Sequence, residues 1–327
     1  MVTPYIDFVI TWVDNQDPTW QAAKNNIFQR ADIDCCDRRF RDWNLLRYWF
    51  RGVERFAPWV RRIHFVTCGH LPEWLNRNHE KIHIVKHSDF IPKQFLPTFN
   101  SNVIDLHLHQ IPGLAEQFVY FNDDVFLIDH VSSEEFFKDS LPCDQAVLGA
   151  VLPQDEPVSS IIFNNIKIIN RYFNKKDLTI RQWRKVLCFC YGKLLVRSIC
   201  LYPFSKHTGF YDPHLAIPLR KETFYTVWSN VKNELTDTCS HKVRSSKDYS
   251  IWLMRYWQLA SGEFKPYKMM GKYFEIGDEK LTSYIREQKG KMVCCNDVRD
   301  NVDFEQEKHN LIKAFECILP EKSSFEK

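Results

Sequence analysis

The sequence has little glycine, no long apolar run and no strong excess of charge of either sign. Only 10 of its 327 residues are glycine, which argues against low-complexity linkers. No apolar stretch reaches the roughly 20 residues of a membrane-spanning helix. No basic segment precedes the strand-like run that starts at Tyr5, so we expect no secretory signal. The net charge of +3 is too small to suggest a nucleic-acid-binding protein.

The cysteines lack the spacing of a zinc or redox site. There are 11, including the adjacent pairs Cys35-Cys36 and Cys294-Cys295, and none forms a C-x-x-C pair. Adjacent cysteines are poor partners for each other in a disulfide, and a zinc site needs spaced ligands. We therefore expect reduced, mostly buried thiols in a cytoplasmic protein.

Aromatic residues are abundant, at 15% of the chain, within a hydrophobic content of 44% that is typical of a folded protein. Apolar runs at 5–13, 62–67, 82–86 and 118–124 predict strands, and apolar spacing predicts helices between them. Strands that alternate with helices indicate a largely parallel sheet. We predict an α/β fold with a Rossmann-like, glycosyltransferase-A-like, mainly parallel sheet flanked by helices, and with a helical insertion.

No linker separates two domains, so we predict a single catalytic domain over residues 1–327. Within it we expect a nucleotide-sugar-binding core at 1–140, a helical insertion at 150–205, the second part of the catalytic core at 206–300 and a C-terminal helix at 303–327. Helices are also predicted at 38–56, 72–75 and 132–138.

Residues 118–127 are the stretch around which the chain is organised. An apolar strand ends there in Asn122, Asp123 and Asp124. Adjacent carboxylates repel each other, and a cation relieves the repulsion. Mg²⁺ and Mn²⁺ both favour carboxylate oxygens, usually with substrate phosphates. Because ligands of open α/β sheets collect at the carboxyl ends of strands, we interpret the motif as a metal–diphosphate site. The alternative is a solvated turn with an Asn or Asp cap.

Other segments offer further candidates for this site. Asn296 and Asp297 repeat the theme of an apolar strand that ends in Asn-Asp, with a capping turn as the alternative. Arg47 and Arg51 share one helical face that is suited to clamping a diphosphate, although such faces are more often solvated or paired with Glu. Trp12, at the end of the first predicted strand, is a plausible floor for a nucleotide.

Two acidic strand ends, several Arg and a few His fit transfer chemistry on a nucleotide-diphosphate sugar. A metal neutralises the diphosphate, Arg holds its oxygens, and one base takes the proton of the acceptor hydroxyl. These residues leave open which bond breaks. Cleavage of the sugar C1–O bond defines a glycosyltransferase, whereas cleavage of the P–O–P bond defines a sugar-phosphate transferase.

Four blocks of the sequence stand in a fixed order. They are Ile6–Asp14 with Asp17-Pro18; Arg39–Asp42 through Ala57–Arg61, Pro72–Leu75, His87–Asp89 and Leu96–Ser101 to Tyr120–Asp124; His214–Lys221 with His241–Arg244 and Asp248; and Cys295–Asp297. Together they resemble the Stealth phosphotransferases, which include bacterial capsule hexose-phosphate transferases and the catalytic subunit of the lysosomal-enzyme GlcNAc-1-phosphotransferase. Asn15-Gln16 departs from the family, where a Gly-Ser type turn is usual.

The resemblance implies transfer of a sugar 1-phosphate from a nucleotide-sugar, usually a UDP-sugar, to an acceptor hydroxyl, with release of UMP. The roles it implies complete the predicted site. Catalytic residues are Asp123, Asp124, His214, Arg244 and Asp248; substrate-binding residues are Asp7, Trp12, Asp14, Arg47, Arg51 and Asn122; metal ligands are Asp123, Asp124, Asn296 and Asp297.

His214 is the candidate base, and His207 is its rival because the alignment around His214 is loose. Pro218 and Lys221 follow His214 at suitable spacing and favour it. The alternative for either histidine is a structural role in the core.

The resemblance also implies capsule or exopolysaccharide synthesis, with Mg²⁺ or Mn²⁺ as the cofactor. The expected partners are a nucleotide-sugar donor and a lipid-linked glycan acceptor, with peripheral association at the inner face of the plasma membrane and no nucleic acid. Arg181–Arg184 suits such association, or is an ordinary solvated helix. The other hypotheses are a metal-dependent glycosyltransferase, which would release UDP, and a non-catalytic sugar- or nucleotide-binding regulator.

Overall fold

The computed structural model of the chain describes residues 5–31, 41–152, 157–299 and 302–327. Its centre is a five-stranded sheet in the order β3-β2-β1-β4-β8. The strands are β1 (Ile6–Thr11), β2 (Ile63–Thr67), β3 (Ile82–Lys86), β4 (Gln117–Phe121) and β8 (Ile217–Arg220). The first four are parallel and β8 runs antiparallel to β4, which confirms the predicted α/β fold.

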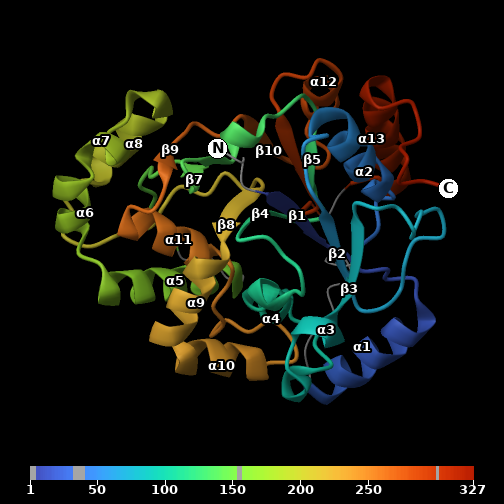
Figure 1. Cartoon of the computed structure of the whole chain (residues 1–327), viewed down its shortest axis with the longest axis horizontal. Coiled ribbons are helices and arrows are strands. Elements are labelled where there is room, and N and C mark those ends of the chain that lie inside the picture. The colour runs from blue at the N-terminus through green and yellow to red at the C-terminus, as the bar shows by residue number, and fades with distance from the viewer. Residues whose placement is uncertain (1–4, 32–40, 153–156, 300–301) are drawn as a thin grey trace.

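Helices cover both faces of this sheet (Figure 1). Side chains alternate along a strand, so Phe8 and Ile10 of β1 enter one core and Val9 enters the other. The first core includes α2 (Leu46–Phe56), α12 (Leu281–Arg286) and α13 (Phe304–Ile318). The second includes α4 (Ser101–Leu106), α9 (Lys221–Asn230), α10 (Lys232–Ser240) and α11 (Trp252–Ser261). Burial on both faces explains why the central strands are continuous apolar runs.

A second sheet places the two Asn-Asp motifs side by side. It contains β10 (Gly271–Glu275), β11 (Met292–Asn296) and β5 (Val125–Leu127). Since β5 follows β4 directly, the chain passes from one sheet to the other at Asn122–Asp124. β11 runs antiparallel to β5, and the backbone N–H of Cys295 donates to the carbonyl of Asp124 at 2.8 Å.

The remaining elements are short or peripheral. A small sheet joins β6 (Phe137–Lys138), β7 (Leu141–Asp144) and β9 (Lys265–Pro266). Helices α5 (Pro157–Tyr172), α6 (Lys175–Arg181), α7 (Trp183–Val186) and α8 (Leu194–Leu201) occupy the region of the predicted insertion. The others are α1 (Pro18–Ala31), α3 (His87–Phe90) and single 3-10 turns at Lys93–Phe95, Leu108–Gln110, Ser133–Glu135 and Phe189–Tyr191.

Several helix predictions need correction. The helix predicted from residue 38 begins at Leu46, and residues 32–40 lie outside the described part of the chain. Residues 72–75 form a turn that ends in an isolated bridge between Leu75 and Glu326, because the C-terminal tail folds back onto this loop. The helix predicted at 132–138 is one 3-10 turn followed by β6. Helix α1 was not predicted, since its apolar residues do not recur at helical spacing.

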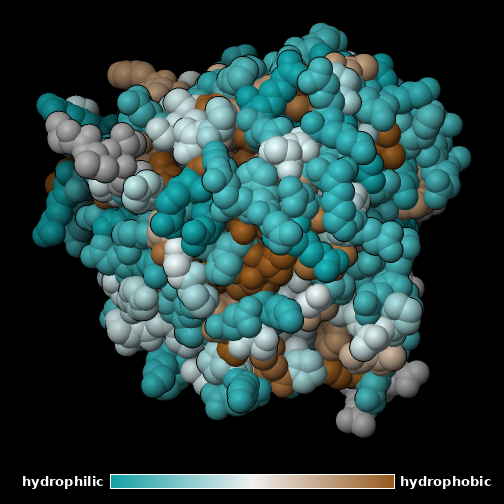
Figure 2. Space-filling view, turned by 45° about the vertical axis from the view of Figure 1, so that its right-hand side comes forward, coloured by the Kyte–Doolittle hydropathy of each residue, from teal (hydrophilic) through white to brown (hydrophobic). Residues whose placement is uncertain are grey.

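Among the described residues, no helix combines the length and apolar composition needed to cross a bilayer. The face shown in Figure 2 is mostly hydrophilic, with hydrophobic side chains gathered near its centre. The described cysteines are all free thiols, but four of them are exposed, which corrects the expectation that most are buried; Cys35 and Cys36 lie outside the described residues.

Candidate active site

The strand order places a topological switch point between β1 and β4. From β1 the chain proceeds outward to β2 and β3 and then returns to the other side of β1 as β4. The C-terminal ends of β1 and β4 lead into Trp12–Asp14 and Asn122–Asp124, and open α/β sheets bind ligands at such a position. Because β8 is antiparallel, its N-terminal end reaches the same edge and brings His214 there.

Asp124 lies against two side chains from distant parts of the sequence. Its Oδ2 lies 3.6 Å from Nε2 of His214 and accepts a hydrogen bond from the Cys294 thiol at 3.3 Å. The backbone N–H of His214 donates to Oδ1 of Asp212 at 2.8 Å, and its φ of 48° is in the left-handed region. This bend presents the imidazole of His214 to Asp124.

These contacts set the ionisation of the site. Burial by itself lowers the pKa of His214, but the hydrogen bond and charge of Asp124, together with the charge of Asp212, outweigh burial and raise the pKa to about 9. Burial and the charge of Asp124 raise the pKa of the Cys294 thiol well above its usual range. In this structure the imidazole is therefore protonated at neutral pH, and the thiol keeps its proton.

Asp123 has a different environment from its neighbour in the sequence. Desolvation and the charge of Asp124 raise the pKa of Asp123 to about 7, and the residue is exposed to solvent. Mutual repulsion of the two carboxylates is the effect that the sequence predicted.

The residues present fit a divalent cation with oxygen ligands. Among the described residues, donor atoms of Asp124, His214 and Cys294 lie within 4.8 Å of one another. Cys294 retains its proton and His214 is paired with Oδ2 of Asp124, so neither offers a free electron pair. The buried Oδ1 of Asp124 has no hydrogen-bond partner within the described part of the chain. That oxygen, with Asp123 beside it, suits Mg²⁺ or Mn²⁺.

Asp297, a predicted metal ligand, has structural partners directly after β11, and its role at a metal stays a prediction. Its Oδ2 accepts a hydrogen bond from Nε1 of Trp43 at 3.1 Å and lies 3.5 Å from Nη1 of Arg41. Asp297 thereby holds the segment before α2 against β11. Asn296 ends β11 beside the acidic motif, and its role stays a prediction.

A buried series of hydrogen bonds leads to Asn122 of the acidic motif and was not predicted. The hydroxyl of Tyr120 lies 3.0 Å from Oδ1 of Asp105 and 2.8 Å from Oδ1 of Asn122. Burial raises the pKa of Asp105 to about 7, despite the opposing effects of Tyr120 and Arg244. A protonated Asp105 can donate to Tyr120, whose own proton then goes to Asn122. The feature of the sequence that could have indicated it is Asp105, a carboxylate among the apolar residues of the helix predicted after Ser101.

Asp248 holds a loop in place through buried hydrogen bonds. The carboxylate is fully buried, and it accepts hydrogen bonds from Nδ2 of Asn100 at 2.7 Å, Nδ2 of Asn102 at 3.1 Å and Nδ1 of His241 at 2.7 Å. The contacts with Asn100 and Asn102 join the third sequence block to the start of α4, and the predicted catalytic role of Asp248 stays a prediction. Arg244 lies in that loop.

Arg244 lies close to the switch point. It donates to Oγ of Ser101 at 2.6 Å, and its charge acts on Asp105. Its predicted contact with phosphate stays a prediction.

Asp7 and Arg51 form ion pairs within the fold, and their predicted roles in substrate binding stay predictions. Asp7 accepts a hydrogen bond from Nε of Arg61 at 2.8 Å and lies 2.9 Å from Nε2 of His64, toward the N-terminal half of β1. Arg51 donates to both carboxylate oxygens of Glu326 in the C-terminal tail, at 2.7 and 2.9 Å. Their partners satisfy both charges away from the switch point.

Trp12 and Asp14 stand at the expected edge of the sheet. The ring of Trp12 meets that of His70 edge-on with centroids 5.3 Å apart, and the backbone N–H of Asp14 donates to Nε2 of His70 at 2.7 Å. His70, which follows β2, was not predicted. Arg47 lies with its guanidinium 5.7 Å from the ring of Trp74. The substrate contacts of Trp12, Asp14 and Arg47 stay predictions.

His207 is a core residue in this structure. It is buried, its ring lies 5.4 Å from that of Phe210, and neither ring nitrogen has a hydrogen-bond partner within the described residues. Burial lowers the pKa of His207 to about 4. The structure therefore brings His214, and not His207, to the acidic motif.

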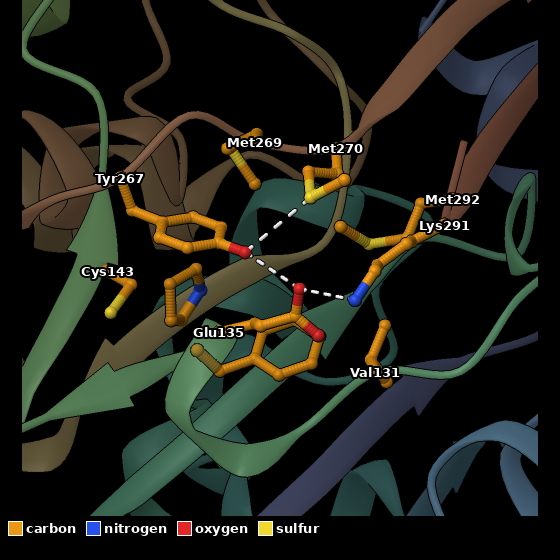
Figure 3. A pocket seen from close by; sticks show the side chains of 10 residues that line it. Val131, Glu135, Cys143, Tyr267, Met269, Met270, Lys291 and Met292 are labelled. Carbon is orange, nitrogen blue, oxygen red and sulfur yellow. Dashed lines mark hydrogen bonds and ion pairs between the residues drawn. The ribbon is translucent and has the colours of Figure 1, made fainter. Parts of the chain in front are cut away.

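A pocket is lined by Glu135, Tyr267 and Lys291 together with several apolar side chains (Figure 3). The hydroxyl of Tyr267 donates to Oε1 of Glu135 at 2.7 Å, and Nζ of Lys291 donates to the same oxygen at 2.6 Å. Methionine side chains line the apolar part of the pocket. Its charges are already paired, so it does not resemble a phosphate site.

A doubly wound α/β sheet with an acidic cluster at its switch point is characteristic of proteins that bind phosphorylated nucleotides. The profile of Stealth protein CR2, conserved region 2, matches residues 39–143, and that of Stealth protein CR1, conserved region 1, matches residues 4–27. A capsular polysaccharide phosphotransferase of Streptococcus pneumoniae is 42% identical over 331 residues, which cover 98% of each chain. An exopolysaccharide phosphotransferase of Lactiplantibacillus plantarum is 39% identical over 326 residues, covering 98% of this chain and 96% of the relative. The chain belongs to the Stealth family of polysaccharide phosphotransferases.

Two solved glycosyltransferases share a weaker likeness. A galactosyltransferase in complex with donor and acceptor sugar analogues gives a TM-score of 0.39 at 11% identity, covering 94% of this chain and 95% of that chain. A bifunctional glycosyltransferase gives 0.40 at 11% identity, covering 97% of this chain and 52% of that chain. Membership of the family rests on the sequence relatives.

Proposed function

We propose that the chain transfers a sugar 1-phosphate from a nucleotide-sugar, in particular a UDP-sugar, to a hydroxyl of a growing glycan. The product is a phosphodiester in a capsule or exopolysaccharide. The observation that carries the proposal is the meeting of Asp124 with His214 at the switch point of the open α/β sheet. The names of the polysaccharide phosphotransferase relatives support the same class of reaction.

The reaction exchanges one bond to phosphorus for another. The acceptor oxygen forms a bond to the β-phosphorus, and the bond from that phosphorus to the bridging oxygen breaks. UMP leaves with the bridging oxygen, and the acceptor hydroxyl gives up its proton. The protein must therefore hold the diphosphate, balance the charge that develops on its oxygens, and accept or relay one proton.

In this proposal Asp124 and Asp123 hold Mg²⁺ or Mn²⁺. A divalent cation bound there supplies positive charge to the diphosphate oxygens. Arg244 holds a phosphate oxygen, and Trp12 and Asp14 line the nucleotide pocket at the neighbouring strand end. The Asp105–Tyr120 pair fixes the orientation of the Asn122 amide toward the substrate.

His214 has two chemically distinct roles open to it. As a base it must be neutral when the acceptor binds, so Asp124 must then cease to stabilise the imidazolium. As a donor it stays protonated and stabilises a phosphate oxygen. A His214→Gln variant keeps an N–H donor but cannot take up a proton. Activity lost in both His214→Gln and His214→Ala indicates a base, whereas activity retained in His214→Gln indicates a donor.

The acceptor is proposed to be a lipid-linked glycan at the inner face of the plasma membrane, so that the enzyme acts from the cytoplasm as a peripheral protein. Polymers of this kind are built on carriers that a protein without a spanning helix must approach from one side. The absence of a spanning helix among the described residues is compatible with this arrangement.

The nucleotide that is released tests the proposal. Purified protein is incubated with Mg²⁺, a panel of UDP-sugars and a glycan acceptor, and UMP is resolved from UDP. We expect UMP with the parent protein and loss of UMP with Asp124→Ala and His214→Ala. Asp237→Ala on α10 and His309→Ala on α13 are matched controls at exposed positions, and we expect both to retain activity.

Release of UDP in place of UMP would overturn the proposal and leave a metal-dependent glycosyltransferase. Binding of UDP-sugars without turnover over the whole panel of acceptors would indicate a regulator on the same fold.

A further inference from the structure

We infer that residues 175–204 form a docking surface for an anionic lipid bilayer. The inference deepens the proposed function and rests on it in one respect, namely that the acceptor is presented at a membrane. Figure 1 shows α6, α7 and α8 grouped at one end of the molecule, away from the central sheet.

Large hydrophobic side chains are concentrated on the outside of this segment. Phe189 is 91% exposed, Ile180 71% and Val196 62%. The full set, here called the docking face, is Ile180, Trp183, Phe189, Val196, Ile199, Tyr202 and Phe204. Single exposed apolar residues are normal on a protein surface, but a cluster of this kind indicates an interaction site.

Leu178, Val186 and Tyr191 are buried, but α8 reverses the usual amphipathic pattern and is attached to the body through polar groups. The backbone N–H of Leu148 donates to Oγ of Ser198 at 2.9 Å, and that of Ala146 donates to the hydroxyl of Tyr191 at 3.2 Å. Ser198 is the buried residue of α8, whereas Val196 and Ile199 of the same helix face outward. A surface helix of a soluble protein normally buries its apolar residues and exposes its polar ones.

A buried lysine fixes this outward presentation. Nζ of Lys175 donates to the carbonyls of Leu201 at 2.7 Å, Tyr202 at 3.2 Å and Phe204 at 2.8 Å. The ammonium thus ties the start of α6 to the end of α8. The aromatic side chains of Tyr202 and Phe204 remain exposed while their backbone is held.

Charge selects an anionic membrane over other apolar partners. Of the 44 Lys and Arg and 41 Asp and Glu in the chain, ten basic residues and one acidic residue, Asp177, lie between residues 157 and 206. The rest of the chain is therefore net negative. Exposed Arg181, Arg184, Lys193 and Arg197 are interleaved with the docking face. Basic residues beside aromatic and aliphatic ones favour the interface of a bilayer that contains anionic lipids.

Vesicle flotation tests the inference with the full chain. Vesicles of phosphatidylcholine mixed with phosphatidylglycerol are compared with vesicles of phosphatidylcholine alone, at low and at high salt. We expect binding to the mixed vesicles that weakens as salt screens the charges. We expect little binding to phosphatidylcholine alone.

Two double variants separate the apolar and the charged contributions. Trp183→Ser with Phe189→Ser, and Arg181→Glu with Arg184→Glu, should each lower the partition coefficient by about tenfold or more. Tyr225→Ser on α9 and Lys232→Glu on α10 alter exposed residues elsewhere and should bind like the parent. Melting curves show whether each variant keeps the parent fold.

The inference is overturned if the parent protein does not float with mixed vesicles, or if the two double variants float like the parent. Concentration-dependent dimerisation that Trp183→Ser with Phe189→Ser abolishes, without vesicle binding, would instead assign the docking face to a second copy of the chain. Release of UMP on a soluble acceptor is measured separately. Failure of that assay with intact vesicle binding would therefore reject the proposed reaction and leave the docking surface standing.

Discussion

At the residue scale, two aspartates that are adjacent in the sequence have different partners. Asp124 faces His214 and Cys294, whereas Asp123 is partly exposed and has its pKa raised to about 7. The buried Oδ1 of Asp124 has no hydrogen-bond partner among the described residues and is available to a cation. A shared motif therefore does not mean a shared role, because each side chain is defined by what the fold places against it.

Tyr120→Phe removes the hydroxyl that links Asp105 to Asn122. Loss of one net hydrogen bond is worth about 1 kcal/mol, so we expect kcat/KM for UMP release to fall by about fivefold to tenfold. Urea unfolding should show a loss of about 1–3 kcal/mol, since Asp105 is left buried without its partner. Tyr225→Phe on α9 is the control. An unchanged kcat/KM would mean that the orientation of the Asn122 amide does not depend on the hydrogen bonds from Asp105 through Tyr120.

His207→Phe should make the protein less sensitive to acid. The pKa of His207 is lowered to about 4 in the fold, from about 6.5 in an unfolded chain. A lowered pKa contributes stability above the unfolded value, and this stability is lost as pH falls toward the folded value. Between pH 7.5 and pH 5 the parent should lose about 2 kcal/mol that the variant retains. An equal loss of unfolding free energy in the parent and in the variant between the two pH values would contradict this account.

At the element scale, one antiparallel strand and one change of sheet build the site. β8 reverses direction beside β4, which carries His214 to the edge where the parallel strands end. β5 leaves the first sheet directly after Asn122–Asp124 and pairs with β11, which brings Cys294 to Asp124. A fully parallel sheet would place the residue before β8 at the opposite edge.

The C-terminal tail is held to α2 by Arg51 and Glu326, both largely buried. Arg51→Met should lower the free energy of unfolding by about 3–5 kcal/mol, because Glu326 is left buried without its charged partner. The double variant Arg51→Met with Glu326→Gln should recover part of that loss. Denaturant midpoints measure both. If Arg51→Met were as stable as the parent, the ion pair between α2 and the C-terminal tail would not contribute to the stability of the fold.

At the scale of the whole molecule, binding of a cation to the folded state alone should stabilise the entire chain. At about 100 times the dissociation constant, Mg²⁺ or Mn²⁺ should add about 2.7 kcal/mol to the free energy of unfolding. Thermal melting with and without each ion measures the effect. Asp124→Asn should abolish it, and the exposed control Asp237→Asn should keep it. A shift that persists in Asp124→Asn would place the cation elsewhere.

The distribution of charge is also a property of the whole molecule. A net charge of +3 conceals a basic segment at 157–206 attached to an acidic remainder. The bulk value is too small to suggest a nucleic-acid partner, and the proposed docking to a membrane depends on the positions of the basic residues beside an exposed apolar face.

By itself, the sequence determined the features that depend on local order. Apolar runs located β1, β2, β3 and β4, their alternation with helices indicated a mainly parallel sheet, and Asn122–Asp124 marked the strand end where ligands gather. Only the tertiary structure decided which charges are free to act. Asp7, Arg51, Asp248 and Asp297 pair with groups far away in the chain, whereas Asp124 meets His214 and Cys294. The reason is physical: spacing along a strand or helix fixes the direction of a side chain, but its charge state and role depend on partners that long-range packing brings to it.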